Sequence, residues 1–431
     1  MDLRGAEDHL LGLELFGMRF GLDRMHRLTT ALGLPQRQFA SVHVVGSNGK
    51  SSTTRMIAAI LQRHGLRTGS YTSPHLGSFV ERIEVDERPV EGVDFAAAVT
   101  RVARAAELVE RTLEPEDRIT QFELLTAAAY HLLARHRVDV AVIEAGLGGR
   151  HDATNVIPSR VQVLTGVALE HTRWLGPTLA DIAEEKLAVV PDHGCLVVAE
   201  LPAEARRVAE RVVRERRARL VRAHPAASPP VAGIHASAAS SPVRPKDPAG
   251  HEAARNFQQR NFALAVAAAE AFHGPLDGEA LERAAAETVV PGRLELVGEH
   301  PLEIHDGAHN PAGAAALAEA LPEMIGGRPL VIVMSVLDDK DARAMLSLLL
   351  PLCERAVFTA CANPRALPPE TLESLAADLG QRACESVADP RAAVERAREA
   401  AGAEGAVLVT GSIHLLGDLV RAPANARAPV L

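Results

Sequence analysis

The sequence predicts an α/β protein of two domains, each built on a mostly parallel sheet. Apolar runs of strand length alternate with helical stretches along the chain, and parallel sheets joined by helices give this alternation. The chain has 431 residues, more than one hydrophobic core usually serves. Val289-Val290-Pro291-Gly292 interrupts a helical stretch before a new series of strands. We therefore expect a larger domain at 1–291 and a smaller, Rossmann-like domain at 292–431.

The first predicted strand, Val42–Val45, runs into a glycine-rich loop and then a helical stretch that ends near Gly65. Strand, glycine loop and helix are the context of a phosphate-binding loop. Glycines let backbone N–H groups turn toward phosphates, and a lysine neutralises their charge. The sequence therefore predicts a nucleoside triphosphate site at Gly46, Ser47, Asn48, Gly49, Lys50, Ser51 and Ser52.

The loop departs from the full motif G-x-x-x-x-G-K-[ST], because Val44 stands where its first glycine would be. The alternative interpretation is an ordinary glycine-rich turn with a surface lysine.

Composition excludes several classes of protein. The net charge of −9 comes from mixed acidic and basic residues, without the basic stripe that nucleic acid requires. The four cysteines form no C-x-x-C pair, as expected for reduced thiols in the cytosol. The acidic start and the lack of a long apolar stretch argue against a secretory signal or a membrane span. We expect a cytoplasmic protein, and a monomer.

Further elements of the first domain follow from the same pattern. Strands are predicted at Val138–Glu144 and Val161–Val167, with a helix at Phe122–His136. Leu201–Val221 reads as a charged, solvent-facing helix. Ala223–Gly250 is rich in Pro, Ala and Ser, which predicts a loop or irregular insert.

The second domain repeats the alternation on a smaller scale, with a last helix after its final strand. The predicted strands are Leu302–His305, Leu330–Val336, Ala356–Ala360 and Ala406–Thr410, and the predicted helices are Pro311–Leu321 and Asp341–Leu350.

Polar side chains at strand ends are the candidates for chemistry in the first domain. Glu144 ends a buried strand, where open α/β sheets bind ligands, and its carboxylate suits Mg²⁺. The alternative is an ion pair with an arginine. His171 follows the next strand, where a histidine more often caps or packs. Lys186 lies in a helical stretch beside two glutamates, and the default interpretation is a helix-surface salt bridge.

In the second domain, Asp306, His309 and Asn310 share one turn between a strand and a helix. Such a turn suits the rim of a ligand site. Helix capping by Asn310, with Pro311 at the first helical position, explains the same residues. Both can hold, because a cap uses Asn310 and leaves Asp306 and His309 free.

Many ordered segments together resemble one family along nearly the whole chain. They are Gly21-Leu22-Asp23-Arg24-Met25, the loop 46–52, Thr72-Ser73-Pro74-His75-Leu76, Glu81-Arg82-Ile83, Phe122-Glu123 with Thr126-Ala127, Gly146-Leu147-Gly148-Gly149-Arg150, Asp152-Ala153-Thr154-Asn155, His171-Thr172, Trp174-Leu175-Gly176, Glu185-Lys186, Gln258 with Asn261, Pro291-Gly292-Arg293-Leu294-Glu295, Asp306 to Pro311, Asp339-Lys340-Asp341 and Thr410-Gly411-Ser412. The chain resembles the folylpolyglutamate synthase/dihydrofolate synthase group of the Mur ligase superfamily.

The resemblance implies ATP-dependent amide bond formation through an acyl phosphate, with L-glutamate as the amine. Lys50 and its loop would hold the phosphates. Ser73, Glu144 and His171 would bind Mg²⁺, with two ions in the site. Lys186 matches the family's carbamylated lysine. A protonated lysine there would repel Mg²⁺, so the resemblance reverses the default interpretation of Lys186.

The resemblance also distributes the substrates over both domains and implies an active site between them. Asn261 and Arg293 match residues that contact ATP, and Asp306 and His309 match residues that reach the nucleotide from the second domain. The pterin site would include Phe122, Asp152 and Ala153, and Ser412 would lie near glutamate.

The chain departs from the family pattern at several positions. Ser51 replaces a glycine, Glu170 an aspartate and Phe257 a histidine, and Met334-Ser335-Val336 lacks a usual glycine. The loop also starts too early for a UDP-sugar-binding domain ahead of it, which favours a folate-type substrate.

The leading hypothesis is a ligase that adds L-glutamate to dihydropteroate, and also to reduced folates. A P-loop ATPase or phosphotransferase without glutamate chemistry is the first rival. A nucleotide-binding regulator without catalysis is the second, and the departures are its only support.

Overall fold

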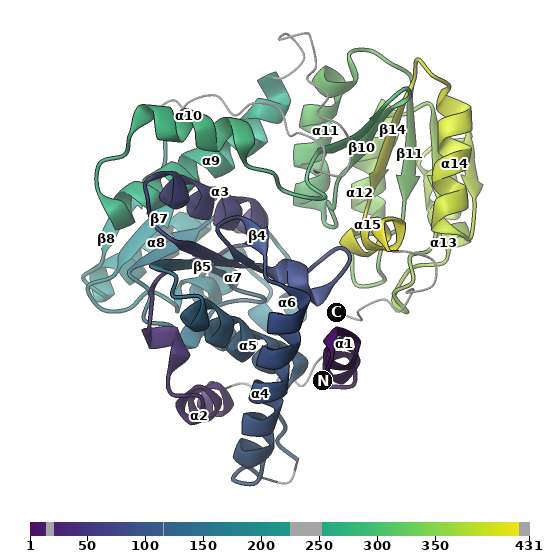
Figure 1. Cartoon of the computed structure of the whole chain (residues 1–431). Helices are drawn as coiled ribbons and strands as arrows, with labels where there is room; N and C mark the ends of the chain where they lie inside the picture. Colours follow the sequence, from purple (N-terminus) through teal and green to yellow (C-terminus); the bar gives the residue numbers. More distant parts are fainter. Residues whose placement is uncertain (14–20, 115, 225–251, 422–431) are drawn as a thin grey trace. The chain divides into compact units, whose positions relative to one another are not determined.

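The computed structural model describes residues 1–13, 21–114, 116–224 and 252–421 (Figure 1). These residues fall into two compact units. The first contains 1–224 and 260–285, and the second contains 252–259 and 286–421. Most of the predicted insert Ala223–Gly250 lies outside the described residues. No described helix has the length and apolar character that crossing a membrane requires.

In the described part of the first unit, eight strands form one sheet in the order β4-β3-β2-β5-β1-β6-β7-β8. All neighbours pair in parallel except β2 with β3 and β3 with β4. The strands are β1 (Ala40–Val45), β2 (Thr68–Tyr71), β3 (Ile83–Val85), β4 (Arg88–Pro89), β5 (Val140–Glu144), β6 (Val161–Leu164), β7 (Cys195–Val198) and β8 (Arg219–Arg222).

Helices cover both faces of this sheet, as expected for strands that are apolar on both sides. The helices of this part of the chain are α1 (Leu3–Leu11), α2 (Asp23–Ala31), α3 (Lys50–Arg63), α4 (Gly92–Glu110), α5 (Gln121–Arg135), α6 (Thr172–Leu175), α7 (Leu179–Leu187), α8 (Ala203–Glu215), α9 (Glu252–His273) and α10 (Gly278–Glu287), with 3₁₀ turns at Pro35–Arg37, Phe79–Arg82 and Ala153–Val156.

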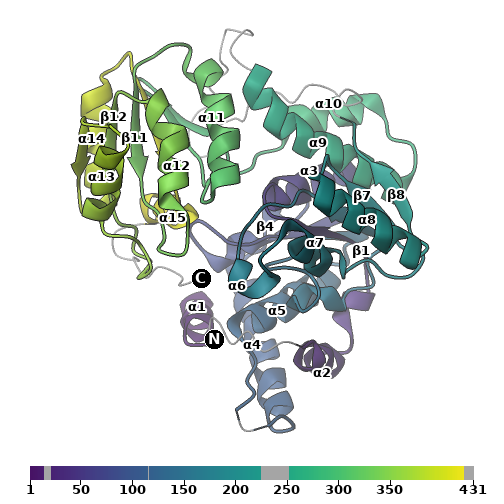
Figure 2. The same ribbon diagram turned by 180° about the vertical axis from the view of Figure 1, so that it is seen from behind.

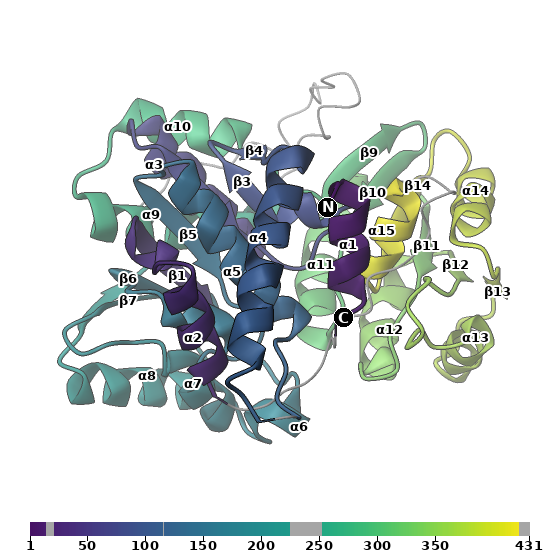
Figure 3. The same ribbon diagram turned by 60° about the horizontal axis from the view of Figure 1, so that its bottom comes forward.

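Packing of these helices forms the cores that support the strand ends. Helix α3 packs on β1, β2 and β5, with α5 on the opposite face (Figure 1). Helix α4 lies against α5, α1 and α2 (Figure 3), and one apolar cluster joins these four helices to Tyr71, Ile83 and Ile143 of the sheet. Helix α7 packs on α8 beside β6 and β7 (Figure 2).

The second unit is a smaller sheet in the order β13-β12-β11-β14-β10-β9, parallel except for β9. Its strands are β9 (Glu295–Glu299), β10 (Leu302–His305), β11 (Leu330–Met334), β12 (Arg355–Phe358), β13 (Cys384–Ser386) and β14 (Ala406–Thr410), and its helices are α11 (Pro311–Ile325), α12 (Ala342–Leu349), α13 (Pro369–Asp378), α14 (Pro390–Ala401) and α15 (Ile413–Val420), with a 3₁₀ turn at Leu350–Leu352.

The predicted α/β fold class is confirmed. The first unit has a large, mostly parallel sheet, and the second unit has a smaller sheet of its own. One predicted element is wrong. The helix expected over Leu201–Val221 ends at Glu215, and Arg219–Arg222 is strand β8. Arg217 adopts left-handed backbone with φ 50°, which breaks the helix. The sequence Arg-Leu-Val-Arg then continues as an edge strand on β7.

An ion pair between a buried glutamate and a part-exposed arginine ties α14 to β10 in the second unit. Glu303 accepts hydrogen bonds from Arg398, at 2.7 Å and 3.1 Å, and from His305 Nε2 at 2.8 Å. Burial raises the pKa of Glu303, but the hydrogen bonds from His305 and Arg398 outweigh burial and lower the pKa to about 2.

The variant Glu303→Gln is expected to lose about 2 kcal/mol of unfolding free energy at neutral pH. Because the folded-state pKa lies below the ordinary 4.5, the carboxylate stabilises the fold above that value and ceases to do so as pH falls toward about 2. Urea unfolding at neutral pH and at a pH of about 3 should therefore show the gap between variant and wild type closing. Glu395→Gln, which alters an exposed partner of the same arginine, is the control, and an equal loss in both variants would contradict this account.

Candidate active site

The loop after β1 has a backbone that glycine allows and side chains would block. Gly46 has φ 147° and Gly49 has φ 80°. A Cβ added at Gly46 would lie 2.0 Å from Thr165 Oγ1, and one at Gly49 would lie 2.5 Å from Asn261 Oδ1. The predicted ATP ligand Asn261, on α9, therefore lies beside the loop. The loop is therefore lined on two sides, by the residue that follows β6 and by α9.

Hydrogen bonds from the end of β6 hold the loop in this form. Thr165 Oγ1 donates to the Asn48 carbonyl at 2.6 Å, and the Ser47 N–H donates to the Gly166 carbonyl at 3.0 Å. Lys50 Nζ folds back and donates to the carbonyls of Gly46 and Ser47, at 3.0 Å and 3.2 Å. Helix α3 begins at Lys50 without a side-chain cap, so its first N–H groups are available to an anion.

Glu144 joins the loop to the segment after β2. Its carboxylate accepts from Ser51 Oγ at 3.0 Å and from the Ser73 N–H at 3.1 Å, and Glu144 is only 1% exposed. Strand β5 lies between β1 and β2 and is parallel to both, which brings these three residues to one edge. Ser51, the residue that replaces a glycine of the family pattern, is thus a direct partner of Glu144.

Lys186 does not lie on a helix surface, and the default interpretation from sequence is wrong. Its side chain is 2% exposed. Its Nζ donates to the Gly46 carbonyl and to Glu170 Oε1, both at 2.9 Å. The helical pattern around Lys186 could not reveal this, because α7 turns this residue toward the phosphate loop while Glu184 and Glu185 stay partly exposed.

Burial and charge act against each other in this pair. Burial lowers the pKa of Lys186, and the Glu170 carboxylate opposes this. Burial raises the pKa of Glu170, but the charges of Lys186 and Lys50 outweigh it and lower the pKa to about 2. Glu170 is therefore an anion that accepts a hydrogen bond from Lys186 and is stabilised by the charge of Lys50 as well. His171, the next residue, precedes α6 in left-handed backbone with φ 46°, a conformation that is uncommon for residues other than glycine.

The residues predicted for the pterin site flank one loop, which follows β5. The Phe122 ring lies against Gly146, where an added Cβ would come within 2.6 Å of Phe122 Cζ. Phe122 also stacks on Tyr71 with ring centroids 6.2 Å apart. Asp152 accepts the Leu147 N–H at 2.8 Å. Burial raises the pKa of Asp152, against hydrogen bonds from Thr154 and Leu147. Ala153, the next residue, is buried.

The candidate residues of the second unit gather at the ends of β10 and β14, which are parallel neighbours. Asp306 follows β10, and a Cβ at Gly307 would lie 3.3 Å from Arg293 Nη1. Ser412 follows β14 and caps α15 by accepting the His414 N–H at 3.1 Å. Burial raises the pKa of Asp306, and the charge of Arg293 opposes this.

Asn310 caps α11 as predicted, by accepting the Gly313 N–H at 2.8 Å. The expectation that this cap leaves Asp306 and His309 free is wrong. Asp306 accepts the N–H groups of Leu294 and Ala308, at 2.9 Å and 2.8 Å. His309 Nδ1 donates to the Gly307 carbonyl at 3.0 Å. A ligand would meet side chains whose orientation the backbone already fixes.

Among the described residues, no group of three or more His, Cys, Asp or Glu side chains is arranged to hold a metal ion. A Mg²⁺ site can be built from fewer protein ligands, because the ion keeps waters and binds phosphate oxygens. The oxygen ligands predicted here, Glu144 and Ser73, lie together.

Sequence reasoning missed Thr165 as the anchor of the loop and Glu170 as the partner of Lys186, since both contacts join segments distant in sequence.

Known proteins resemble this chain along nearly its whole length. The profile of the family described as Mur ligase, glutamate ligase domain, matches residues 292–413. A dihydrofolate synthase/folylpolyglutamate synthase of Mycobacterium tuberculosis is 36% identical over 392 residues, covering 84% of this chain and 78% of that protein. The protein of the same name from Bacillus subtilis is 31% identical over 425 residues, covering 96% and 97%.

Solved structures share the fold. Mycobacterium tuberculosis folylpolyglutamate synthase complexed with ADP has a TM-score of 0.85 and 31% identity, covering 97% of this chain and 98% of that one. E. coli FolC in complex with DHPP and ADP has a TM-score of 0.80 and 29% identity, covering 97% of each chain. Sequence identity above 30% over most of both chains, on the same fold, means that this chain belongs to the dihydrofolate synthase/folylpolyglutamate synthase family of glutamate ligases.

Proposed function

We propose that this chain uses ATP to join L-glutamate to dihydropteroate, and also to reduced folates. The proposal rests on one observation. The ends of β1, β5 and β6 bring together Lys50, Glu144 and Lys186 around the phosphate-binding loop. A cationic lysine, a buried carboxylate and a second, buried lysine around a phosphate-binding loop suit phosphoryl transfer, which depends on positioning and charge stabilisation. ADP and DHPP bound in a structure of a relative support the same substrates.

The reaction has two steps. A carboxylate oxygen of the pterin substrate attacks the γ-phosphorus of ATP, which gives an acyl phosphate and ADP. The neutral amine of glutamate then attacks the carbonyl carbon, phosphate leaves and the nitrogen loses a proton. Lys50 and the N–H groups of the loop hold the phosphates, and for this Lys50 turns away from the Gly46 and Ser47 carbonyls. Exclusion of water protects the acyl phosphate from hydrolysis.

Glu144, Ser73 and His171 are the residues that we assign to Mg²⁺, with two ions in the site. When bound, Mg²⁺ neutralises phosphate charge and orients the γ-phosphate. The chemistry of the donor set fits, because Glu144 and Ser73 supply oxygen atoms and the buried carboxylate is held at the edge where the phosphate loop lies.

We further propose that Lys186 acts as a carbamate. Its amine would attack carbon dioxide and lose a proton, which replaces a cation with an anion beside the loop. Burial supports this chemistry because it lowers the pKa of Lys186 and so favours the neutral, nucleophilic amine.

The remaining assignments follow the family resemblance and the geometry within each unit. Asn261, Arg293, Asp306 and His309 are assigned to the nucleotide, with 292–431 as the second domain. Phe122, Asp152 and Ala153 are assigned to the pterin and Ser412 to glutamate. We propose that the protein works as a monomer in the cytoplasm, without nucleic acid or membrane partners.

Phosphate release with Mg²⁺-ATP and L-glutamate tests the function. Dihydropteroate, tetrahydrofolate and no pterin are compared, and products are weighed by mass spectrometry. Dihydropteroate that gains one glutamate makes the chain a dihydrofolate synthase, and addition to both pterins makes it bifunctional. Phosphate without ligated product would favour an ATPase, and ATP binding without turnover would favour a regulator.

Gly46→Ala is expected to displace the phosphate loop, because its Cβ would overlap Thr165 Oγ1. We expect ATP affinity to fall by about tenfold or more, with a stability loss of about 1–3 kcal/mol. Gly166→Ala is the matched control, since no atom other than those of its chain neighbours lies within 4 Å of its Cβ position. Calorimetric ATP titration and thermal unfolding check both variants. Equal ATP affinity in Gly46→Ala and wild type would show that the loop tolerates the side chain.

Lys186→Ala is expected to lower turnover by about 10²-fold or more, because the site loses a fixed charge beside the phosphates. Wild-type turnover should rise when bicarbonate is restored to carbon dioxide-depleted enzyme, and the variant should not respond. ¹³C-bicarbonate NMR should give a carbamate signal in wild type alone. Full turnover of Lys186→Ala, with or without bicarbonate, would rule out the carbamate role.

A further inference from the structure

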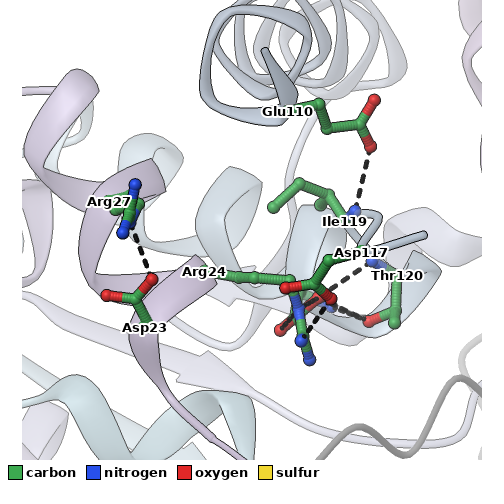
Figure 4. Close-up of polar contacts among 8 residues, drawn as sticks. Asp23, Arg24, Arg27, Glu110, Asp117, Ile119 and Thr120 are labelled. Atoms are coloured by element: carbon green, nitrogen blue, oxygen red, sulfur yellow. Dashed lines mark hydrogen bonds and ion pairs between the residues drawn. The ribbon is translucent and has the colours of Figure 1, made fainter. Parts of the chain in front are cut away.

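Arg24 is a buried arginine outside the candidate active site. It lies on α2, and its side chain is 7% exposed. Its Nε donates to both carboxylate oxygens of Glu123, at 2.9 Å and 3.1 Å, and its Nη1 donates to Asp117 Oδ1 at 2.8 Å. Figure 4 shows Arg24 extending toward Asp117 and Thr120, whereas Arg27 pairs with Asp23. Burying an arginine is expensive unless its donors are satisfied, so this geometry is closely specified.

Glu123 connects Arg24 to the first turn of α5. The same carboxylate accepts the Thr120 N–H at 2.9 Å and the Thr120 hydroxyl at 3.0 Å, and Thr120 in turn accepts the Glu123 N–H. A capping box of this kind fixes where a helix begins. Arg24 therefore holds the residues that set the start and direction of α5.

The segment before Thr120 is fastened on two sides. Arg24 binds Asp117, and Glu110 at the end of α4 accepts the Ile119 N–H at 2.9 Å (Figure 4). Helix α5 thus receives its position from α2 and α4 as well as from its own packing.

Phe122 is part-exposed in this turn, between buried Gln121 and buried Glu123. Its ring fills the space beside Gly146 and stacks on Tyr71. Gly146 follows Glu144 by two residues and Tyr71 precedes Ser73 by two. A shift of the first turn of α5 would therefore move the ring relative to the loops that carry the site.

We propose that Arg24 is a positioning residue that fixes the Phe122 ring for the pterin substrate. It touches neither the substrate nor the reacting atoms, and it acts through Glu123 and the cap of α5. The inference rests on the proposed function in one respect, the assignment of Phe122 to the pterin site.

Arg24→Lys is the test variant, since lysine keeps the charge but cannot reproduce the planar fork of donors. We expect the KM for dihydropteroate to rise about tenfold, with kcat within about threefold of wild type and the KM for ATP unchanged. Arg27→Lys is the matched control on the same helix, because its side chain is 46% exposed and pairs with Asp23. The control should behave as wild type.

Unchanged KM for dihydropteroate in folded Arg24→Lys, or equal rises in the KM for both substrates, would overturn the proposal. If Arg24→Lys fails to fold, Asp117→Asn is the second test variant. It weakens the contact between Arg24 and Asp117 from the side of Asp117, whose side chain is 26% exposed. That variant should raise the KM for dihydropteroate alone.

Calorimetric binding of dihydropteroate separates this proposal from the proposed function. If wild type binds dihydropteroate but ligates nothing, the function fails, and a Kd about tenfold weaker in Arg24→Lys still supports the positioning role. If wild type does not bind dihydropteroate, both fail.

Discussion

Two lysine side chains, Lys50 and Lys186, donate to the same carbonyl oxygen, that of Gly46, and the candidate site is organised around that contact. Lys50 approaches this oxygen to 3.0 Å and Lys186 to 2.9 Å. Positive charge on both lysines would be repulsive, and the Glu170 carboxylate, which accepts a hydrogen bond from Lys186 and whose pKa both lysines lower, supplies the compensating negative charge. The site can accept an anion, because phosphate oxygens can replace the loop carbonyls as hydrogen-bond partners of Lys50.

This contact depends on the order of strands in the large sheet. Strand β1 lies between β5 and β6, so the residues that follow the three strands arrive at one edge. Thr165 and Gly166 from the β6 side hold the loop, and Glu144 from β5 ties it to Ser73. The absence of a side chain at Gly46 lets the loop approach Thr165. The strand order, the glycine at position 46 and the charges of the two lysines therefore all affect the same loop.

Local patterns predicted the elements well and the contacts poorly. Strand β10 was predicted with its observed bounds, and Asn310 caps α11 as its position before a proline indicates. The strand β8 was missed, because a charged amphipathic pattern does not reveal where a left-handed residue ends a helix. The burial of Lys186 was also beyond sequence periodicity. Two glutamates precede it in the chain, but its partners, Gly46 and Glu170, come from two other loops. Family resemblance predicts a role for Lys186 in the site, and physical reasoning from the residues did not.

The central claim is that ATP activates a carboxylate of the substrate. The most direct test follows an oxygen atom from that carboxylate to the released phosphate. Dihydropteroate labelled with ¹⁸O in its carboxylate is incubated with the enzyme, Mg²⁺-ATP and L-glutamate, and the phosphate is analysed by mass spectrometry. An acyl phosphate requires one labelled oxygen in each phosphate released during ligation. Unlabelled phosphate with labelled pterin would contradict the account, since ATP would then be cleaved by water.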